Sequence, residues 1–287
     1  MRYPVGLTQS FSTSMEDAVI SQYARGDILE SILQALKSQG KDLTKLTAVD
    51  LAPVDEFHIR GREATIELAD LAALRPGLRV LDVGSGLGGS VRYLAAEHGC
   101  RAAGIDLTEE YVQAATALTT LVGLEHAVAF HWGSALAMPF PDESFDVVWT
   151  EHAQMNIADK HAFYRELARV LARGGRLVFH DVFKGAGGPL HFPVPWANDA
   201  SISFLADVEE ARAAITNAGL KVSHWEDVTQ RSLDWIVGAL ERSQQAGRSP
   251  LGLHMLMGDN ARNKSTNNVA NLRERRTLIV QARCEKR

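Results

Sequence analysis

A glycine-rich stretch at residues 80–89 constrains the fold of this chain more than any other feature of its sequence. A short apolar run ends in Asp82, glycines follow at positions 84, 86, 88 and 89, and apolar residues then recur at helical spacing. This order predicts a strand, a tight turn and a helix, the first βα unit of a doubly wound sheet. Glycine suits such a turn because a backbone that bends sharply and approaches a ligand leaves no room for a Cβ atom.

Two nucleotide cofactors fit the turn by glycine spacing. Positions 84, 86 and 89 satisfy the G-x-G-x-x-G pattern of dinucleotide-binding proteins, and positions 84, 86 and 88 satisfy the G-x-G-x-G pattern of S-adenosylmethionine (SAM) methyltransferases. A glycine turn without a ligand is the third alternative. Asp82 favours SAM, because a carboxylate there repels a pyrophosphate but attracts the ammonium group of a methionine moiety. The stretch 80–88 therefore resembles motif I of class I methyltransferases, which implies a cofactor-binding set of Asp82, Gly84, Ser85, Gly86 and Gly88.

The next acid downstream extends the expected nucleotide site. Residues 101–106 predict the second strand, and Asp106 ends it 24 residues beyond Asp82. A carboxylate at that distance accepts hydrogen bonds from a ribose diol, and we expect Leu107 beside it. Many SAM enzymes carry an aspartate where Ser134 stands, to bind the adenine amino group. This chain departs from them, so we expect the Ser134 hydroxyl or the backbone around Ala135 to contact the adenine.

A second motif strengthens the resemblance. Residues 138–148, Met-Pro-Phe-Pro-Asp-Glu-Ser-Phe-Asp-Val-Val, are similar to a recurring signature of small-molecule methyltransferases of the ubiquinone/menaquinone-biosynthesis type. Residues 173–181 resemble the glycine turn and fifth strand of the same family, so the resemblance covers about 61–182. The layout is also similar to that of sarcosine/dimethylglycine N-methyltransferases. The family implies an α/β fold, a Rossmann-like doubly wound sheet of seven strands, with SAM as cofactor.

Composition and charge exclude several other classes. The 287 residues are 46% hydrophobic and 23% charged, as in a soluble globular protein. A formal net charge of −5 argues against a nucleic-acid partner. No apolar run is long enough to span a membrane, and two distant cysteines favour a cytoplasmic location. No histidine pair has metal-ligand spacing, so no metal site is predicted.

The pattern along the chain predicts four segments. Residues 1–60 form an N-terminal helical arm or lid that begins with a loose stretch at 1–12, and 61–228 form the SAM-binding core. Residues 229–276 form a helical cap inserted before the last core strand at 277–287. Within these segments we expect a linker at 51–61 and a surface loop or lid at 184–198, which is rich in glycine and proline. A homodimer is compatible with the sequence.

Polar residues at the ends of the fourth and fifth predicted strands are candidates for chemistry, because ligands lie beyond the carboxyl ends of the strands in such sheets. Glu151 and His152 follow the fourth strand, and His180 and Asp181 end the fifth. We place Glu151 on the cofactor and assign His152, His180 and Asp181 to catalysis, since in-line methyl transfer requires removal of the acceptor's proton and histidine titrates near neutrality. His58 precedes the core, where related enzymes cover the methionine end of SAM.

The sequence therefore predicts a SAM-dependent methyltransferase that acts on a small-molecule acceptor at nitrogen or oxygen. Residues 150–154 lack the Asn/Asp-Pro-Pro-aromatic motif used for exocyclic or amide nitrogens, which argues against a DNA adenine or a protein glutamine as acceptor. Two alternatives stay open at this point. One is a nicotinamide-dependent Rossmann oxidoreductase, and the other is a SAM-binding protein without transfer activity.

Overall fold

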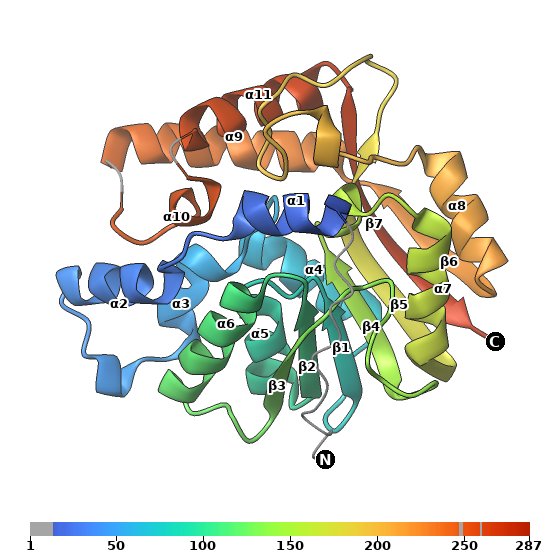
Figure 1. The fold of residues 1–287 in the computed structure, drawn as a ribbon, viewed down its shortest axis with the longest axis horizontal. Coiled ribbons are helices and arrows are strands. Elements are labelled where there is room, and N and C mark those ends of the chain that lie inside the picture. The colour runs from blue at the N-terminus through green and yellow to red at the C-terminus, as the bar shows by residue number, and fades with distance from the viewer. Residues whose placement is uncertain (1–13, 247–248, 259) are drawn as a thin grey trace.

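The computed structural model describes residues 14–246, 249–258 and 260–287, and it contains a sheet of seven strands in the order β3-β2-β1-β4-β5-β7-β6. Figure 1 shows the sheet with helices on both sides and a group of helices above one edge. The strands are β1 (Arg79–Val83), β2 (Arg101–Asp106), β3 (Val128–Trp132), β4 (Phe145–Glu151), β5 (Leu171–Lys184), β6 (Leu220–Asp227) and β7 (Thr277–Lys286). The predicted Rossmann-like α/β fold is confirmed.

The helices fall into three groups along the chain. The N-terminal group is α1 (Ser14–Tyr23), α2 (Ile28–Ser38), the 3₁₀ turn η1 (Leu43–Lys45) and α3 (Ala48–Asp55). The core group is α4 (Gly61–Ala72), α5 (Gly89–His98), α6 (Glu109–Leu121), η2 (Gln154–Asn156), α7 (Lys160–Val170), η3 (Ala200–Ile202) and α8 (Val208–Asn217). The C-terminal group is α9 (Thr229–Ala246), α10 (His254–Met257) and α11 (Ala261–Arg273).

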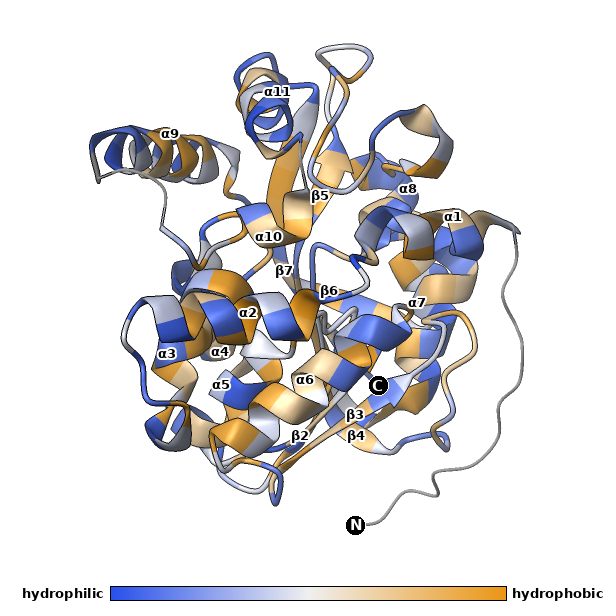
Figure 2. Cartoon of the chain, turned by 60° about the vertical axis from the view of Figure 1, so that its left-hand side comes forward, coloured by the Kyte–Doolittle hydropathy of each residue, from blue (hydrophilic) through white to orange (hydrophobic). Residues whose placement is uncertain are grey.

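Apolar side chains hold the helices against the sheet. One buried cluster joins α4 and α5 to the strands, and a second joins α7 and α8 to the opposite face. Figure 2 shows hydrophobic and hydrophilic residues alternating around the helices that cover the sheet, as expected of helices with one buried face. Parallel strands buried on both faces read as continuous apolar runs, and the sequence of β1 and β4 follows this rule.

The register of the central strands brings their carboxyl ends to one edge. β1 pairs in parallel with β2 and β4, so that Asp82 lies opposite Gly104 on one side and Trp149 on the other. β4 pairs in parallel with β5, with Glu151 opposite His180. β7 runs antiparallel between β5 and β6. The ends of β1, β2 and β4 therefore present Asp82, Asp106 and Glu151 at the same edge.

The linker predicted at 51–61 is wrong in its first half, because α3 runs through Asp55. The backbone nitrogen and the hydroxyl of Thr47 both donate to Asp50 Oδ2, at 2.9 and 2.8 Å, and so begin this helix. Leu51 and Val54 are fully buried within it. Pro53 lies inside α3. Proline usually indicates a break in a helix, so the sequence pattern did not predict a helix here.

The C-terminal insertion is helical, as expected for 229–276. Figure 1 shows α9 and α11 above the strand ends, with α1 between them and the sheet. The loop at 184–198 is more buried than a surface loop, because Val194, Trp196 and Ala197 are all buried against neighbouring segments. In the described ranges, each helix is too short or too polar to cross a membrane. The four-segment division of the chain stays a prediction, and its first stretch at 1–12 lies outside the described residues.

Candidate active site

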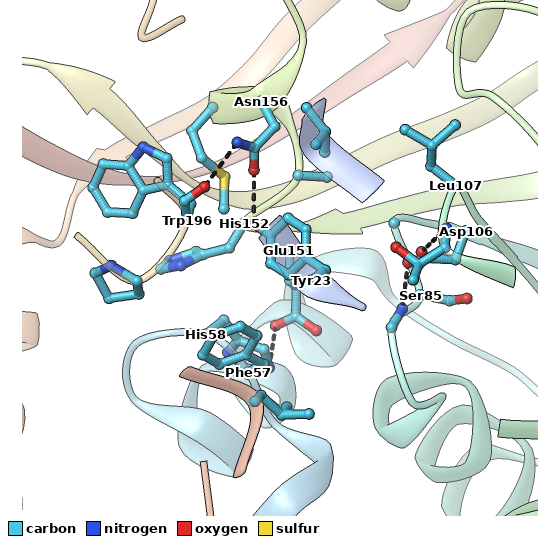
Figure 3. Close-up of a pocket in the computed structure, with 18 of the residues that line it drawn as sticks. Tyr23, Phe57, His58, Ser85, Asp106, Leu107, Glu151, His152, Asn156 and Trp196 are labelled. Atoms are coloured by element: carbon cyan, nitrogen blue, oxygen red, sulfur yellow. Dashed lines mark hydrogen bonds and ion pairs between the residues drawn. The ribbon is translucent and has the colours of Figure 1, made fainter. Parts of the chain in front are cut away.

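A cavity of about 460 Å³ opens at the carboxyl ends of β1, β2 and β4. Its floor is the glycine turn and these strand ends, and its walls come from α1, from the loops after β4 and β5, and from α9, α10 and α11. Figure 3 shows how residues from these distant segments converge. The volume lies in the range of small-molecule sites in proteins.

The turn that forms the floor requires glycine at two positions, for different physical reasons. Gly84 has a φ of 80°, and a Cβ there would lie 2.7 Å from the Cβ of Ala153. Gly84, Ser85 and Gly86 line the cavity, whereas Gly88 is not among its lining residues. A Cβ at Gly88 would overlap the ring of Phe130. The expected cofactor contact of Gly88 stays a prediction, and the observed reason for glycine at this position is the packing of the turn against β3.

Asp106 is held in place by the backbone of the turn. Its Oδ2 accepts from the Gly86 nitrogen and its Oδ1 from the Thr108 nitrogen, both at 2.8 Å. Burial raises the pKa of the Asp106 carboxyl, and these backbone hydrogen bonds oppose the shift. Each carboxylate oxygen has a further lone pair. The group is thus oriented, and it can accept the hydroxyl groups of a ribose.

The residues expected at the adenine end also line the cavity, but one of them already has a partner. Leu107, Ser134 and Ala135 are lining residues. The Ser134 hydroxyl donates to Glu16 Oε1 at 2.6 Å and accepts from the Leu136 nitrogen at 3.1 Å. Glu16 belongs to α1, so a helix from the N-terminal segment supplies a carboxylate at this end. An acid in the first turn of a helix is common at a helix start, and no further signal in the sequence indicates Glu16.

A buried charge cluster lies beneath the other end of the cavity. Nε2 of His58 lies 3.0 Å from Glu56 Oε2 and 3.5 Å from Glu151 Oε1, as Figure 3 shows for the pair with Glu151. Ser90 Oγ and Trp149 Nε1 donate to Glu151 Oε2 at 2.6 and 2.9 Å. These donors orient Glu151 at the cavity floor, where Asp82 also lies.

The charge of His58 follows from this cluster. Burial lowers the pKa of His58, but the carboxylates of Glu151 and Glu56 outweigh burial and raise it to about 9. The imidazole is therefore a cation near neutral pH. Burial raises the pKa of Glu56, but His58 and Arg62 together lower it below its ordinary value. The cation and its flanking acids thus stabilise one another inside the protein.

His152 directly follows β4 and lines the cavity, with a φ of 49° that few residues other than glycine adopt. Its ring stacks on the ring of His180, with centroids 5.2 Å apart and planes inclined by 17°. Burial lowers the pKa of His152 well below 6.5, and the neighbouring His180 and His58 lower it further. Within the described chain its buried Nε2 makes no hydrogen bond. His152 is therefore neutral and presents a nitrogen without a partner.

His180 and Asp181 lie behind this residue, outside the cavity lining. The Nε2 of His180 lies 3.0 Å from the carbonyl oxygen of Ile59, and the ring is fully buried. Asp181 accepts from the backbone nitrogens of Ala153, Gln154 and Val182 at 3.2, 3.1 and 2.8 Å. The assignment of His180 and Asp181 to direct catalysis is thus not supported by their positions. They support the backbone that carries His152.

Several lining residues had no signal in the sequence. The Tyr23 hydroxyl donates to Asn156 Oδ1 at 2.7 Å, and Asn156 Nδ2 donates to the carbonyl oxygens of Trp196 and Ile202 at 3.0 and 2.9 Å. These bonds tie α1 to the loops after β4 and β5 (Figure 3). Apolar residues complete the wall: Met155, Trp196, Phe204, Trp235, Ile236, Ala239, Leu240, Leu256 and Met257.

Residues 81–179 match a family described as a methyltransferase domain. The chain is also 31% identical over 194 residues to 27-O-demethylrifamycin SV methyltransferase of Amycolatopsis mediterranei (strain S699), and the match covers 63% of this chain and 69% of that protein. The chain belongs to the class I SAM-dependent methyltransferases.

Further comparisons place this methyltransferase within the family. It is 30% identical over 178 residues to glycine/sarcosine/dimethylglycine N-methyltransferase of Actinopolyspora halophila, covering 62% of this chain and 32% of that protein. The chain spans between 27% and 36% of the length of the first curated relatives that it matches. Geranyl diphosphate C-methyltransferase from Streptomyces coelicolor A3(2) has the same fold, with a TM-score of 0.73 at 15% identity over 97% of this chain and 100% of that one.

The residues of this methyltransferase fit its cofactor. Ser85 lines the cavity, and its Oγ makes no hydrogen bond to another described residue. Asp106 offers acceptors for a ribose. Burial raises the pKa values of the Asp82 and Glu151 carboxyl groups at the cavity floor, and a sulfonium and an ammonium group bound there would favour their charged forms. No group of three or more His, Cys, Asp or Glu within the described ranges is arranged to hold a metal ion.

Proposed function

We propose that this chain transfers a methyl group from SAM to a small-molecule acceptor, at oxygen or nitrogen, by in-line displacement. The observation that carries the proposal is the continuity of one cavity. It runs from Asp106 and the glycine turn, where a nucleoside fits, past Glu151 to His152 under the cap. A cofactor and an acceptor can therefore lie side by side in a space closed by α1 and α9.

Each polar side chain has a role in this proposal. Asp106 and Ser85 orient the nucleoside, and Asp82 and Glu151 attract the positively charged methionine end. His58 holds Glu151 in position through the ion pair at 3.5 Å. His152 accepts the proton that the acceptor releases, since its ring is neutral and borders the cavity. Positioning of this kind converts a bimolecular step into an intramolecular one and supplies much of the rate acceleration.

The names of the relatives support a small-molecule acceptor without selecting one. They include an enzyme for 27-O-demethylrifamycin SV and one for glycine, sarcosine and dimethylglycine. These molecules differ in size, in charge and in the atom that takes the methyl group. The proposal extends to a location in the cytoplasm, and a homodimer stays an expectation. It includes no nucleic-acid or membrane partner.

Titration calorimetry and label transfer test the proposal. S-adenosylhomocysteine and NAD are titrated into the protein separately, and we expect saturable binding of the first alone. Methyl-labelled SAM is then incubated with the protein and a metabolite extract, and we expect label in one or a few small molecules. Binding of NAD in place of S-adenosylhomocysteine supports the oxidoreductase alternative. Binding of S-adenosylhomocysteine without transfer from any extract supports a SAM-binding protein that lacks transfer activity.

A further inference from the structure

Apart from His58, the charged side chains that line the cavity in the described structure are acidic. Acidic side chains line it, among them Glu16, Asp82, Asp106, Glu151 and Asp159. Arginine and lysine are missing from the lining as far as the described residues go. The cation that does line it, His58, lies between Glu56 and Glu151 and is already balanced by them. An anionic acceptor would therefore find no free counter-charge from the protein in this site, which is unfavourable for a buried charge.

The basic side chains nearest to the wall are directed to other partners. Lys160 Nζ donates to the carbonyl oxygens of Gln154 and Phe204, each at 2.6 Å, and also to that of Ile157. Lys264 Nζ donates to the Met257 carbonyl oxygen at 3.0 Å. The Arg25 Nε donates to the carbonyl oxygen of Leu256 at 3.1 Å. These cations stabilise the backbone of the wall and leave its inner surface apolar.

The inner surface of the cavity on the cap side consists mainly of apolar side chains, which fit an apolar ligand. α9 contributes Trp235, Ile236, Ala239 and Leu240, and the two loops opposite contribute Met155, Trp196 and Phe204. The polar groups between them are neutral ones, such as the amides of Asn156 and Asn268 and the hydroxyl of Ser265. Apolar walls with a few neutral hydrogen-bonding groups are typical of sites for uncharged ligands.

His152 indicates which group the ligand presents. The ring lines the cavity, and its Nε2 makes no hydrogen bond in the described structure, so this nitrogen keeps its hydrogen-bonding capacity for a ligand hydroxyl. An aliphatic amine arrives protonated at neutral pH, and the carboxylates of the cavity favour that charged form. A protonated amine has no free electron pair with which to attack a methyl group. A hydroxyl keeps its lone pairs and can give its proton to the imidazole.

We propose that the acceptor is an electrically neutral molecule with an apolar body and a hydroxyl group, and that phosphate- and carboxylate-bearing acceptors are rejected. This inference rests on the proposed function and names its substrate class. In the reaction the hydroxyl oxygen attacks the methyl carbon as the O–H proton passes to the His152 nitrogen. The new O–C bond forms while the S–C bond breaks, and the electron pair of that bond returns to sulfur. The products are a methyl ether and S-adenosylhomocysteine.

Three matched probes test the proposed preference for a neutral acceptor. They are 2-naphthol, 6-hydroxy-2-naphthoate and 2-naphthylmethylamine, which are neutral, anionic and cationic at neutral pH. Each is titrated by calorimetry into the full chain saturated with S-adenosylhomocysteine. We expect 2-naphthol to bind at least tenfold more tightly than the naphthoate. Label transfer from SAM is expected to 2-naphthol and not to the amine. Equal or tighter binding of the naphthoate, methylation of the amine in preference to the naphthol, or no binding of 2-naphthol at millimolar concentration overturns the proposal.

A charge-introducing variant separates this preference from simple shape selection. L240K places an ammonium group in the wall of α9, and L240M keeps the wall apolar at similar volume. We expect L240K to reduce the preference for naphthol over naphthoate at least tenfold and L240M to retain it. An unchanged preference in L240K counts against the proposal. Failure of the wild-type chain to bind S-adenosylhomocysteine counts instead against the proposed function, so the two failures are distinguishable.

Discussion

The carboxylate of Glu16 accepts a hydrogen bond of 2.6 Å from the hydroxyl of Ser134, although 118 positions separate the two residues. The bond joins α1 to the loop after β3, at the end of the cavity beyond Asp106. If Asp106 binds the ribose, we expect the base to extend toward β3 and this pair. Glu16 therefore brings a carboxylate to a place where the loop itself has a hydroxyl. We therefore expect the N-terminal helix to take part in nucleotide binding.

Replacement of Glu16 by alanine is expected to weaken S-adenosylhomocysteine binding by about tenfold, which corresponds to about 1.4 kcal/mol. The reason is loss of the acceptor for an amino group and of the bond that holds α1 in place. Titration calorimetry measures the effect. Asp17→Asn, an exposed position on the same helix, is the control and is expected to bind like the wild type. Equal affinity of Glu16→Ala and the wild type contradicts the role given to α1.

Asp106→Ala is expected to weaken SAM and S-adenosylhomocysteine equally, by about 1–3 kcal/mol, because two ribose hydroxyls lose their acceptor. The two ligands share the ribose and differ at the sulfur, so a loss of equal size identifies the ribose as the point of contact. Asp142→Ala removes an exposed acid from the loop before β4 and is the matched control. A loss confined to one of the ligands contradicts the assignment of Asp106.

The local part of the site could be predicted from the sequence, and the part formed by distant segments could not. Asp82 and Asp106 end strands whose periodicity is readable, and parallel pairing brings such ends together. Glu16 and Tyr23 reach the cavity from a helix whose position depends on its contact with η3 and on hydrogen bonds to the loops after β3 and β4. Glycine spacing could not separate a ligand contact from packing, because Gly88 faces the ring of Phe130.

The two histidines show the same limit. His152 and His180 both stand near the ends of parallel strands, and composition gives no reason to choose between them. In the structure Glu151, not His152, pairs with His180 across β4 and β5. His152 therefore lies one residue beyond this pair, where it lines the cavity. The register between two strands depends on tertiary packing, so the sequence pattern within one strand does not predict which residues pair.

His58 predicts a loss of stability at alkaline pH. Its pKa is raised from 6.5 to about 9 in the folded chain. The stabilisation from its charged form is thus full below pH 6.5 and decreases as the pH rises through about 9. One pKa unit corresponds to about 1.4 kcal/mol, so the total effect is a few kcal/mol. Urea unfolding at pH 6.5 and 9.5 measures it, and His58→Gln is expected to lose most of this pH dependence.

Lys160 titrates in the same pH range and has the opposite effect on stability. The effect of His58 is therefore measured as a difference between the wild type and a His58 mutant. Burial lowers the pKa of Lys160 from 10.5 to about 8, and stability from that residue rises with pH between these values. His224 lies 3.7 Å from Glu226 on the protein surface, and His224→Gln is the control for removing an exposed His–Glu pair. A wild-type pH dependence in His58→Gln would falsify the proposed charge of the buried cluster.

The last prediction separates catalysis from binding at His152. His152→Ala is expected to lower kcat by about 10²–10⁴ on the acceptor identified by label transfer, because a general base contributes this much. The affinity for S-adenosylhomocysteine is expected to stay within about twofold of the wild type, since we expect its ribose and methionine contacts at other residues.

The pH profile of the rate provides the second measurement. The pKa of His152 is lowered well below 6.5, so the wild-type rate should rise with pH in the acid range and be level at neutral pH. The mutant should lack that acid-side step. His180→Asn is the companion variant: behind the cavity, it should lower stability more than it alters the pH profile. A mutant that keeps both the wild-type rate and the acid-side step removes His152 from the proton transfer.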